Sequence, residues 1–284
     1  MQRLILLALI FFGTDAPGEA QRAGHSHEIS SKYLNEDRVI TVSVPADYRN
    51  GEDAYPTLYL LDGEWIFEFA SGAVALLSND SIGHIPHMIV VGIPNTDRTR
   101  DLSVTLNTND GYESFLKFLE LEVVPLVDRE YRTSGFNLLY GWSSGSAICG
   151  QMMARRPALF DAYLQSGAGI GSKSSAFLAE RLPENNYENK FLYVNAEGGG
   201  PRADGLRRYS KLIESLQLKG LRWKFEILEG STHLEVLPEG LEAGLSFVFS
   251  DFRVPEAIAK SGSKAVISDL EEVQSCLLYT SDAA

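Results

Sequence analysis

The chain has few cysteines, a shortage of basic residues and no apolar run long enough to span a membrane. Only two cysteines, Cys149 and Cys276, occur among 284 residues, so we do not expect a disulfide framework to hold the fold together. Lysine and arginine number 25 against 38 aspartates and glutamates, which gives a net charge of −13. No basic stripe is visible that would neutralise phosphates, which argues against nucleic-acid binding and against anionic membranes.

The one strongly apolar run lies at the N-terminus and is too short to cross a bilayer. It occupies residues 4–12, directly after Arg3, and small residues follow at Gly18 and Ala20. A basic start, an apolar run and small residues at the cleavage positions are typical of a secretory signal peptide. We therefore expect residues 1–20 to be a signal peptide and the protein to be exported, to the periplasm or the cell exterior. The alternative is a buried N-terminal strand or helix.

After this segment, short apolar strand patterns alternate with helical patterns. Strands are expected at residues 38–44, 57–61, 87–93, 136–140, 160–164, 191–194 and 223–228. Helices are expected at residues 66–77, 112–127, 146–156, 174–181, 206–218 and 238–249. This alternation predicts an α/β fold with a mostly parallel central sheet flanked by helices. Because only a short helix fits between the strands at 160–164 and 191–194, we expect no large cap domain.

The pattern predicts one folded domain with a tail. The domain is expected to cover residues 21–253, with a loose start before Glu28 and a polar loop at 95–108. Residues 254–284 break the alternation and are expected to form a C-terminal tail. The alternative is a docked terminal helix around residues 267–273.

A pentapeptide stands between an expected strand and an expected helix. Residues 141–145 read Gly-Trp-Ser-Ser-Gly. In that position a G-x-S-x-G sequence is typical of a nucleophile elbow, whose sharp turn exposes the middle serine, here Ser143. The glycines on either side leave room for the strained serine backbone. Because the motif also occurs in turns without chemistry, its meaning depends on the residues that the rest of the chain supplies.

A serine nucleophile needs a general base, usually histidine, and a carboxylate that orients the base. After a nucleophile elbow the acid and then the histidine follow in the chain. His233 is the only one of the five histidines that follows Ser143, and it lies just after the last expected strand. Glu197 lies close behind the strand at 191–194 and is the favoured acid. Asp204, beyond three glycines, is the alternative.

The negative charge that develops on an ester oxygen needs backbone N–H donors. One donor is expected from the amide of Ser144, at the start of the helix after the elbow, where the helix dipole favours negative charge. The other is expected from the amide of Glu64, after the Asp-Gly turn at residues 62–63. The alternative is that this Asp-Gly pair is merely a turn.

Aromatic and charged side chains near these segments are candidates for substrate contacts. Trp65, Trp142 and Tyr112 are the aromatic candidates for the wall of a substrate pocket, and the alternative is that they belong to the core. Residues 97–101 read Asp-Arg-Thr-Arg-Asp. We expect a salt-bridged loop there, and the alternative is that its arginines meet an acidic substrate.

Together these segments resemble the esterase D-like branch of the α/β-hydrolase family, which includes siderophore esterases, feruloyl esterases and S-formylglutathione hydrolases. The resemblance covers residues 33–252. It rests on P-T-L-Y-L-L-D-G at 56–63, I-V-V-G-I at 89–93, R-T-R-D at 98–101, G-W-S-S-G at 141–145 and G-S-T-H at 230–233. It implies an α/β-hydrolase catalytic domain in which Ser143 and His233 carry the chemistry and the amides of Ser144 and Glu64 hold the oxyanion.

We therefore expect an exported serine esterase, a carboxylic-ester hydrolase that acts on small or activated esters through an acyl-enzyme intermediate. Siderophore, feruloyl or acetyl-xylan esters are alternative substrates. A non-catalytic binding module on a hydrolase scaffold is the alternative from another class. No metal or organic cofactor is expected. The expected partner is a small-molecule ester, with no nucleic acid and no stable membrane association after removal of the signal peptide.

Overall fold

The computed structural model describes residues 24–49, 51–79, 83–104, 110–168 and 172–252. The expected signal peptide at 1–20, the expected tail at 254–284 and Cys276 lie outside the described residues. Within the described ranges, no helix combines the length and the apolar character needed to cross a bilayer.

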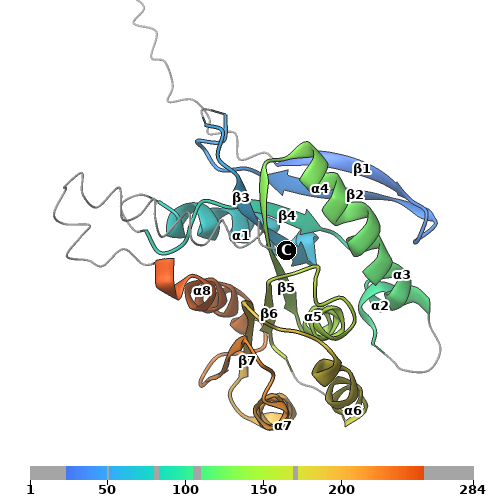
Figure 1. Ribbon diagram of the computed structural model, residues 1–284, viewed down its shortest axis with the longest axis vertical. Coiled ribbons are helices and arrows are strands. Elements are labelled where there is room, and N and C mark those ends of the chain that lie inside the picture. Colours follow the sequence, from blue (N-terminus) through green and yellow to red (C-terminus); the bar gives the residue numbers. More distant parts are fainter. Residues whose placement is uncertain (1–23, 50, 80–82, 105–109, 169–171, 253–284) are drawn as a thin grey trace, which may run out of the picture.

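A single sheet forms the centre of the described structure (Figure 1). Its strand order is β1-β2-β4-β3-β5-β6-β7-β8. The strands are β1 (His25–Ser31), β2 (Glu36–Ser43), β3 (Tyr55–Leu61), β4 (Ile89–Ile93), β5 (Thr133–Trp142), β6 (Ala162–Ser166), β7 (Lys190–Glu197) and β8 (Leu221–Leu228). Strands β3 to β8 run parallel, whereas β2 pairs antiparallel with β4 and β1 antiparallel with β2. The expected mostly parallel sheet is confirmed.

Helices cover both faces of this sheet. They are α1 (Gly63–Leu77), α2 (Arg98–Leu102), α3 (Asp110–Phe118), α4 (Val124–Glu130), α5 (Ser144–Arg155), α6 (Ser172–Arg181), α7 (Gly200–Leu216) and α8 (Val236–Val248). Helices α1 and α8 pack on one face through residues such as Ile66 and Leu241, and α3 to α7 pack on the other through residues such as Met152 and Leu206 (Figure 1). Every residue of β3, β4 and β6 is buried, as expected for strands covered on both faces.

The structure adds elements that the hydrophobic pattern did not predict. Of the residues expected to be loose before Glu28, residues 25–27 belong to β1, which pairs with β2 along its whole length. Helix α2 lies inside the expected polar loop at 95–108, and the Asp97 carboxylate caps it by accepting a hydrogen bond from the Arg100 amide at 3.0 Å. The helix expected at 112–127 is divided by a π-helical turn at Leu119–Val123.

The parallel strands bring their carboxyl ends to one edge of the sheet, where α/β proteins bind their ligands. Asp62 follows β3, Ser143 follows β5 and Glu197 ends β7. Between β6 and β7 the structure places α6 and a 3₁₀ turn at Leu182–Glu184, so no large cap covers this edge within the described residues. This edge carries the residues that the sequence analysis singled out.

Candidate active site

Ser143 occupies a strained turn between β5 and α5. Its backbone has φ 55° and ψ −113°, a left-handed region that a residue with a side chain rarely adopts. A Cβ at Gly141 would overlap the backbone of Gly145, so the close approach of strand and helix requires glycine there. The Ser143 amide donates to the Ser166 carbonyl at 2.9 Å, and the Ser146 hydroxyl donates to the Ser143 carbonyl at 2.6 Å. The turn therefore holds the Ser143 side chain at the end of β5.

His233 lies in the loop between β8 and α8 and contacts two of the residues singled out in the sequence. Its Nε2 lies 3.1 Å from the Ser143 hydroxyl, and its Nδ1 lies 3.1 Å from Oε2 of Glu197. The indole N–H of Trp142 donates to the His233 carbonyl at 2.8 Å, and the two rings stack with centroids 4.9 Å apart. Beneath the imidazole, Gly167 comes so close that a Cβ there would lie 2.7 Å from its Cε1. The histidine is thus fixed from several sides.

Glu197, rather than Asp204, is the carboxylate beside His233. Burial by itself would raise the pKa of Glu197. Hydrogen bonds from its own backbone N–H and from His233, followed by the charges of His233 and Arg202, outweigh burial and lower that pKa below 4.5. Asp204 instead lies exposed on α7 and pairs with Arg207 at 2.9 Å. Asp204 therefore does not contact His233 in the structure, because the chain after Gly199 carries it onto the outer surface of α7.

The two expected oxyanion donors both lie in first helical turns. Ser144 is the first residue of α5, and Glu64 is the second residue of α1. The N–H groups of a first turn have no acceptor within the helix, so they are free to point at an anion. The Glu64 side chain turns toward Asn95, accepting from its backbone N–H at 3.1 Å and its side-chain amide at 2.9 Å. The Glu64 carboxylate is thereby held by the loop after β4.

An aromatic shelf, consisting of Trp65 and Trp142, lies next to His233. The ring centroids of the two tryptophans are 5.9 Å apart, and Trp65 is 60% exposed. The Arg98 guanidinium carbon lies 5.7 Å from the Trp65 ring and 5.9 Å from the Trp142 ring. Both tryptophans therefore present aromatic surface near Ser143, with a cation beside them.

Tyr112 does not belong to this site. Its hydroxyl accepts a hydrogen bond from Arg155 at 3.0 Å, and Arg155 ends α5. Ser143 lies at the opposite end of α5, about 18 Å away along the axis at 1.5 Å per residue. The expectation for Tyr112 is corrected, because α3 packs beside the far end of α5 and takes its aromatic side chain with it.

The charged segment at 97–101 forms ion pairs with the protein, as expected for a salt-bridged loop. Arg100 contacts Glu36 at 2.8 Å and Asp101 at 2.7 Å, and the buried Arg38 contacts Asp101 at 2.8 Å. The hydrogen bond from Arg100 is the main reason that the pKa of Glu36 falls to about 2. Arg98 pairs with Asp62, a contact that the sequence analysis missed because it depends on the fold.

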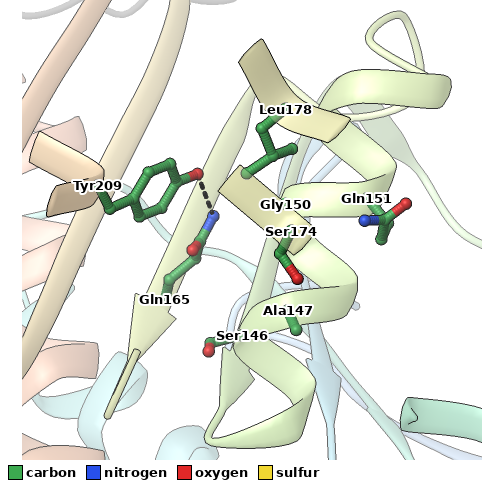
Figure 2. Close-up of a pocket in the computed structure, with 8 residues that line it drawn as sticks. All are labelled: Ser146, Ala147, Gly150, Gln151, Gln165, Ser174, Leu178 and Tyr209. Carbon is green, nitrogen blue, oxygen red and sulfur yellow. Dashed lines mark hydrogen bonds between the residues drawn. The ribbon is translucent and has the colours of Figure 1, made fainter. Parts of the chain in front are cut away.

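A small pocket lies alongside α5 (Figure 2). It is lined by Ser146, Ala147, Gly150, Gln151, Gln165, Ser174, Leu178 and Tyr209. Figure 2 shows the side chains of Gln165 and Tyr209 facing each other, and the Gln165 amide donates to the Tyr209 hydroxyl at 3.5 Å. Ser143 is not among the lining residues, so this pocket flanks the elbow without including the serine hydroxyl.

Comparison with known proteins identifies the family. The esterase family, described as "Putative esterase", matches residues 31–196, which is more than half of the chain. An IroE-like serine hydrolase from Shewanella oneidensis is 29% identical, with a TM-score of 0.77 over 90% of this chain and 88% of that one. Ferri-bacillibactin esterase BesA from Bacillus subtilis is 23% identical over 226 residues, which cover 68% of this chain and 78% of BesA.

A more distant structure has the same fold. The enterobactin esterase Fes from Shigella flexneri is 17% identical, with a TM-score of 0.65 over 81% of this chain and 59% of Fes. The match to the esterase family ends one residue before Glu197, so the places of Glu197 and His233 rest on the geometry described above. The chain belongs to the esterase family and is a serine carboxylic-ester hydrolase of the α/β-hydrolase fold.

Proposed function

We propose that Ser143, His233 and Glu197 form a catalytic triad that hydrolyses esters through an acyl-enzyme. The observation that carries the proposal is the position of His233, whose two ring nitrogens each lie 3.1 Å from one of the other two side chains. A histidine held in this way can accept the serine proton on one nitrogen while the carboxylate fixes its other nitrogen. The strained backbone of Ser143 keeps the hydroxyl at the sheet edge during the reaction.

The proposed reaction has two steps that share one proton carrier. Ser143 Oγ forms a bond to the ester carbonyl carbon while His233 takes its proton, and the carbonyl electrons move onto oxygen. When these electrons return, the bond to the alcohol breaks and His233 returns the proton to the departing alcohol. Water then attacks the acyl-enzyme by the same route and releases the acid. In both steps the amides of Ser144 and Glu64 stabilise the negative oxygen, a contribution of roughly 10²- to 10³-fold per donor in such enzymes.

Hydrolysis of a short-chain p-nitrophenyl ester tests the triad. We expect Ser143→Ala and His233→Ala each to lower kcat by at least roughly 10³-fold, because the nucleophile and its base act as a unit. Ser215→Ala, which removes an exposed hydroxyl on α7, is the control and should retain full activity. Equal rates in wild type and Ser143→Ala would refute Ser143 as the nucleophile. A wild type no faster than buffer would favour a non-catalytic binding module.

The aromatic shelf favours esters that carry an aromatic group with a negative charge. Trp65 and Trp142 offer ring surface for stacking, and Arg98 places a cation against both rings. Ferric catecholate siderophore esters combine these features, whereas a feruloyl ester supplies the aromatic group without the charge. BesA and Fes are named for siderophore substrates. In a panel of acetyl, feruloyl and catecholate esters, Trp65→Ala should raise KM for the aromatic esters and leave KM for the acetyl ester unchanged. Equal effects on all esters would refute an aromatic subsite.

We also propose that the protein is exported after removal of residues 1–20. The support is the order of Arg3, the apolar run at 4–12 and the small residues Gly18 and Ala20. Export from a bacterial host and N-terminal sequencing of the mature protein test this. The mature chain should begin at Gln21, and an exported chain that still begins at residue 1 would refute cleavage.

A further inference from the structure

A buried carboxylate lies at the edge of the candidate oxyanion site. Asp62, which links β3 to α1, is 1% exposed. Its Oδ2 would lie 3.6 Å from a Cβ built on Gly145, in the first turn of α5. Asp62 therefore lies within van der Waals reach of the helix turn that begins with Ser144. Along the chain, Asp62 is followed directly by Gly63 and Glu64.

This position creates an electrostatic conflict. If the amides of Ser144 and Glu64 hold the oxyanion, negative charge develops in the transition state close to the Asp62 carboxylate. Two like charges in a site shielded from water repel each other far more strongly than they do in bulk solvent. Left alone, Asp62 would oppose the charge that the two amides are placed to stabilise.

Arg98 resolves the conflict by pairing with Asp62 through two hydrogen bonds. Its Nε donates to Asp62 Oδ1 at 2.7 Å and its Nη2 donates to Oδ2 at 2.9 Å. The side-chain amide of Asn95 adds a further donor to Oδ1 at 2.7 Å. A two-pronged pair of this kind is the strongest arrangement available to arginine and carboxylate. Consistent with it, the hydrogen bond to Asp62 is the main cause that raises the pKa of Arg98.

The backbone explains why a carboxylate occupies this position. Asp62 has φ 56° and ψ 40°, a left-handed conformation that aspartate and asparagine tolerate better than other residues with side chains. This turn aims the start of α1 at the sheet edge, and the contacts of Asp62 with Asn95 and Arg98 tie it to the loop after β4. Asp62 thus fixes the turn that positions the start of α1. It also brings a negative charge to the site, and this charge must be offset.

We propose that Arg98 is a positioning residue that neutralises Asp62 and so preserves the oxyanion site, acting on the transition state rather than on substrate affinity. The proposal rests on the proposed function, because it assumes an oxyanion held by the amides of Ser144 and Glu64. It assigns Arg98 a role even for uncharged esters that have nothing to pair with an arginine.

A double-mutant cycle on p-nitrophenyl acetate, a neutral ester, tests this role. Arg98→Met exposes the Asp62 charge and should lower kcat roughly 10- to 100-fold, less than or similar to the loss of one oxyanion donor, with KM changed less than about threefold. Adding Asp62→Asn removes the charge and keeps a residue that tolerates the left-handed turn. The double variant should recover kcat to within roughly fivefold of wild type, a coupling that independent sites do not show.

Further variants separate charge from geometry. Arg98→Lys keeps the positive charge without the two-pronged contact and should lie between wild type and Arg98→Met. Arg129→Met is the control for the loss of one positive charge, because Arg129 is an exposed residue of α4 that pairs with Glu130. Its kcat should equal that of wild type.

Several outcomes would overturn the inference. A rise in KM with unchanged kcat in Arg98→Met would make Arg98 a substrate ligand. A double variant as slow as Arg98→Met would show that exposed charge on Asp62 is not the cause, and thermal melting of both would reveal whether the turn had unfolded. A fully active Arg98→Met beside an inactive Ser143→Ala would refute this inference alone. An active Ser143→Ala would refute the proposed function itself.

Discussion

Glu197 divides its two carboxylate oxygens between His233 and Arg202. Oε2 lies 3.1 Å from His233 Nδ1, and Oε1 lies 3.0 Å from Arg202 Nη1. Gly199 and Gly200, with φ of 77° and 68°, turn the chain so that α7 begins beside the end of β7. Arg202 in the first turn of α7 therefore reaches back to Glu197. The same contact that fixes the carboxylate also offsets part of its negative charge.

Arg202→Met should move the acidic limb of the kcat/KM profile to higher pH. The charge of Arg202 is one of the causes that lower the pKa of Glu197, so its removal lets Glu197 take up a proton at a higher pH. The expected shift is modest even at low salt, because Arg202 is 48% exposed and water screens its charge. In 0.5 M NaCl the difference between wild type and variant should shrink.

Arg207→Met is the matched control for this measurement. It removes the same charge from the same helix, but Arg207 pairs with Asp204 and is not in contact with Glu197 in the structure. Its pH profile should follow that of wild type. An equal shift in both variants would mean that the effect comes from net charge rather than from the contact with Glu197.

Replacing the two candidate acids separates their roles. Glu197→Gln keeps the shape of the side chain and removes the charge that stabilises a protonated imidazole, so kcat should fall roughly 10²- to 10⁴-fold. Asp204→Asn should stay within twofold of wild type, because Asp204 lies on the surface of α7. Steady-state kinetics on one p-nitrophenyl ester is sufficient. A large loss in Asp204→Asn with little loss in Glu197→Gln would reverse the assignment.

Strand ends explain how much of this site could be predicted from the sequence. The order of Ser143, Glu197 and His233 follows from which residues come directly after apolar strands, and strand ends are fixed by the sheet. The hydrophobic pattern around Tyr112 predicts a helix there. It does not reveal which end of α5 this helix packs against, and Tyr112 was therefore misplaced. The pair of Asp62 and Arg98 was missed because it depends on a left-handed turn and on a loop 36 residues further along the chain.

The sequence analysis missed β1 and α2 for similar physical reasons. Strand β1 is mostly polar, H-S-H-E-I-S-S, so periodicity gives little signal, and its pairing with β2 stabilises it. Helix α2 has only five residues and depends on its Asp97 cap and on the ion pairs of Arg100 and Asp101. Local sequence patterns do not reveal elements that tertiary contacts hold in place.

Glu36 should contribute stability that disappears in acid. Its pKa falls from 4.5 to about 2 in the folded protein, chiefly through the hydrogen bond from Arg100. A lowered folded-state pKa means that the contribution is complete above about pH 4.5 and is lost as pH falls toward 2. Wild type should therefore melt at a higher Tm than Glu36→Gln at pH 6, and the two values should converge near pH 2.5. A Tm difference that stays constant between these pH values would contradict this linkage.

Gly240→Ala tests the packing behind His233. Gly240 in α8 lies against the side chains of Asn195 and Ser166, and an added Cβ would overlap both. Asn195 accepts the Gly167 N–H at 3.2 Å, and Gly167 lies beneath the imidazole of His233. Overpacking costs about 1–3 kcal/mol, whereas alanine gains about 1 kcal/mol of helix propensity over glycine, so overpacking should outweigh the gain.

The expected result for Gly240→Ala is a Tm lowered by up to roughly 8 °C together with a reduced kcat, since at this size 1 kcal/mol corresponds to about 2–4 °C. Gly244→Ala, one turn further along α8, is the matched control. Its Cβ would lie 3.1 Å from Leu164 Cδ2 and Tyr193 Cδ1, a milder overlap than at Gly240, and it would not press on Asn195 or Ser166. It should therefore leave kcat unchanged. If Gly240→Ala lowers Tm but leaves kcat unchanged, the packing of Asn195 and Gly167 does not determine the position of His233.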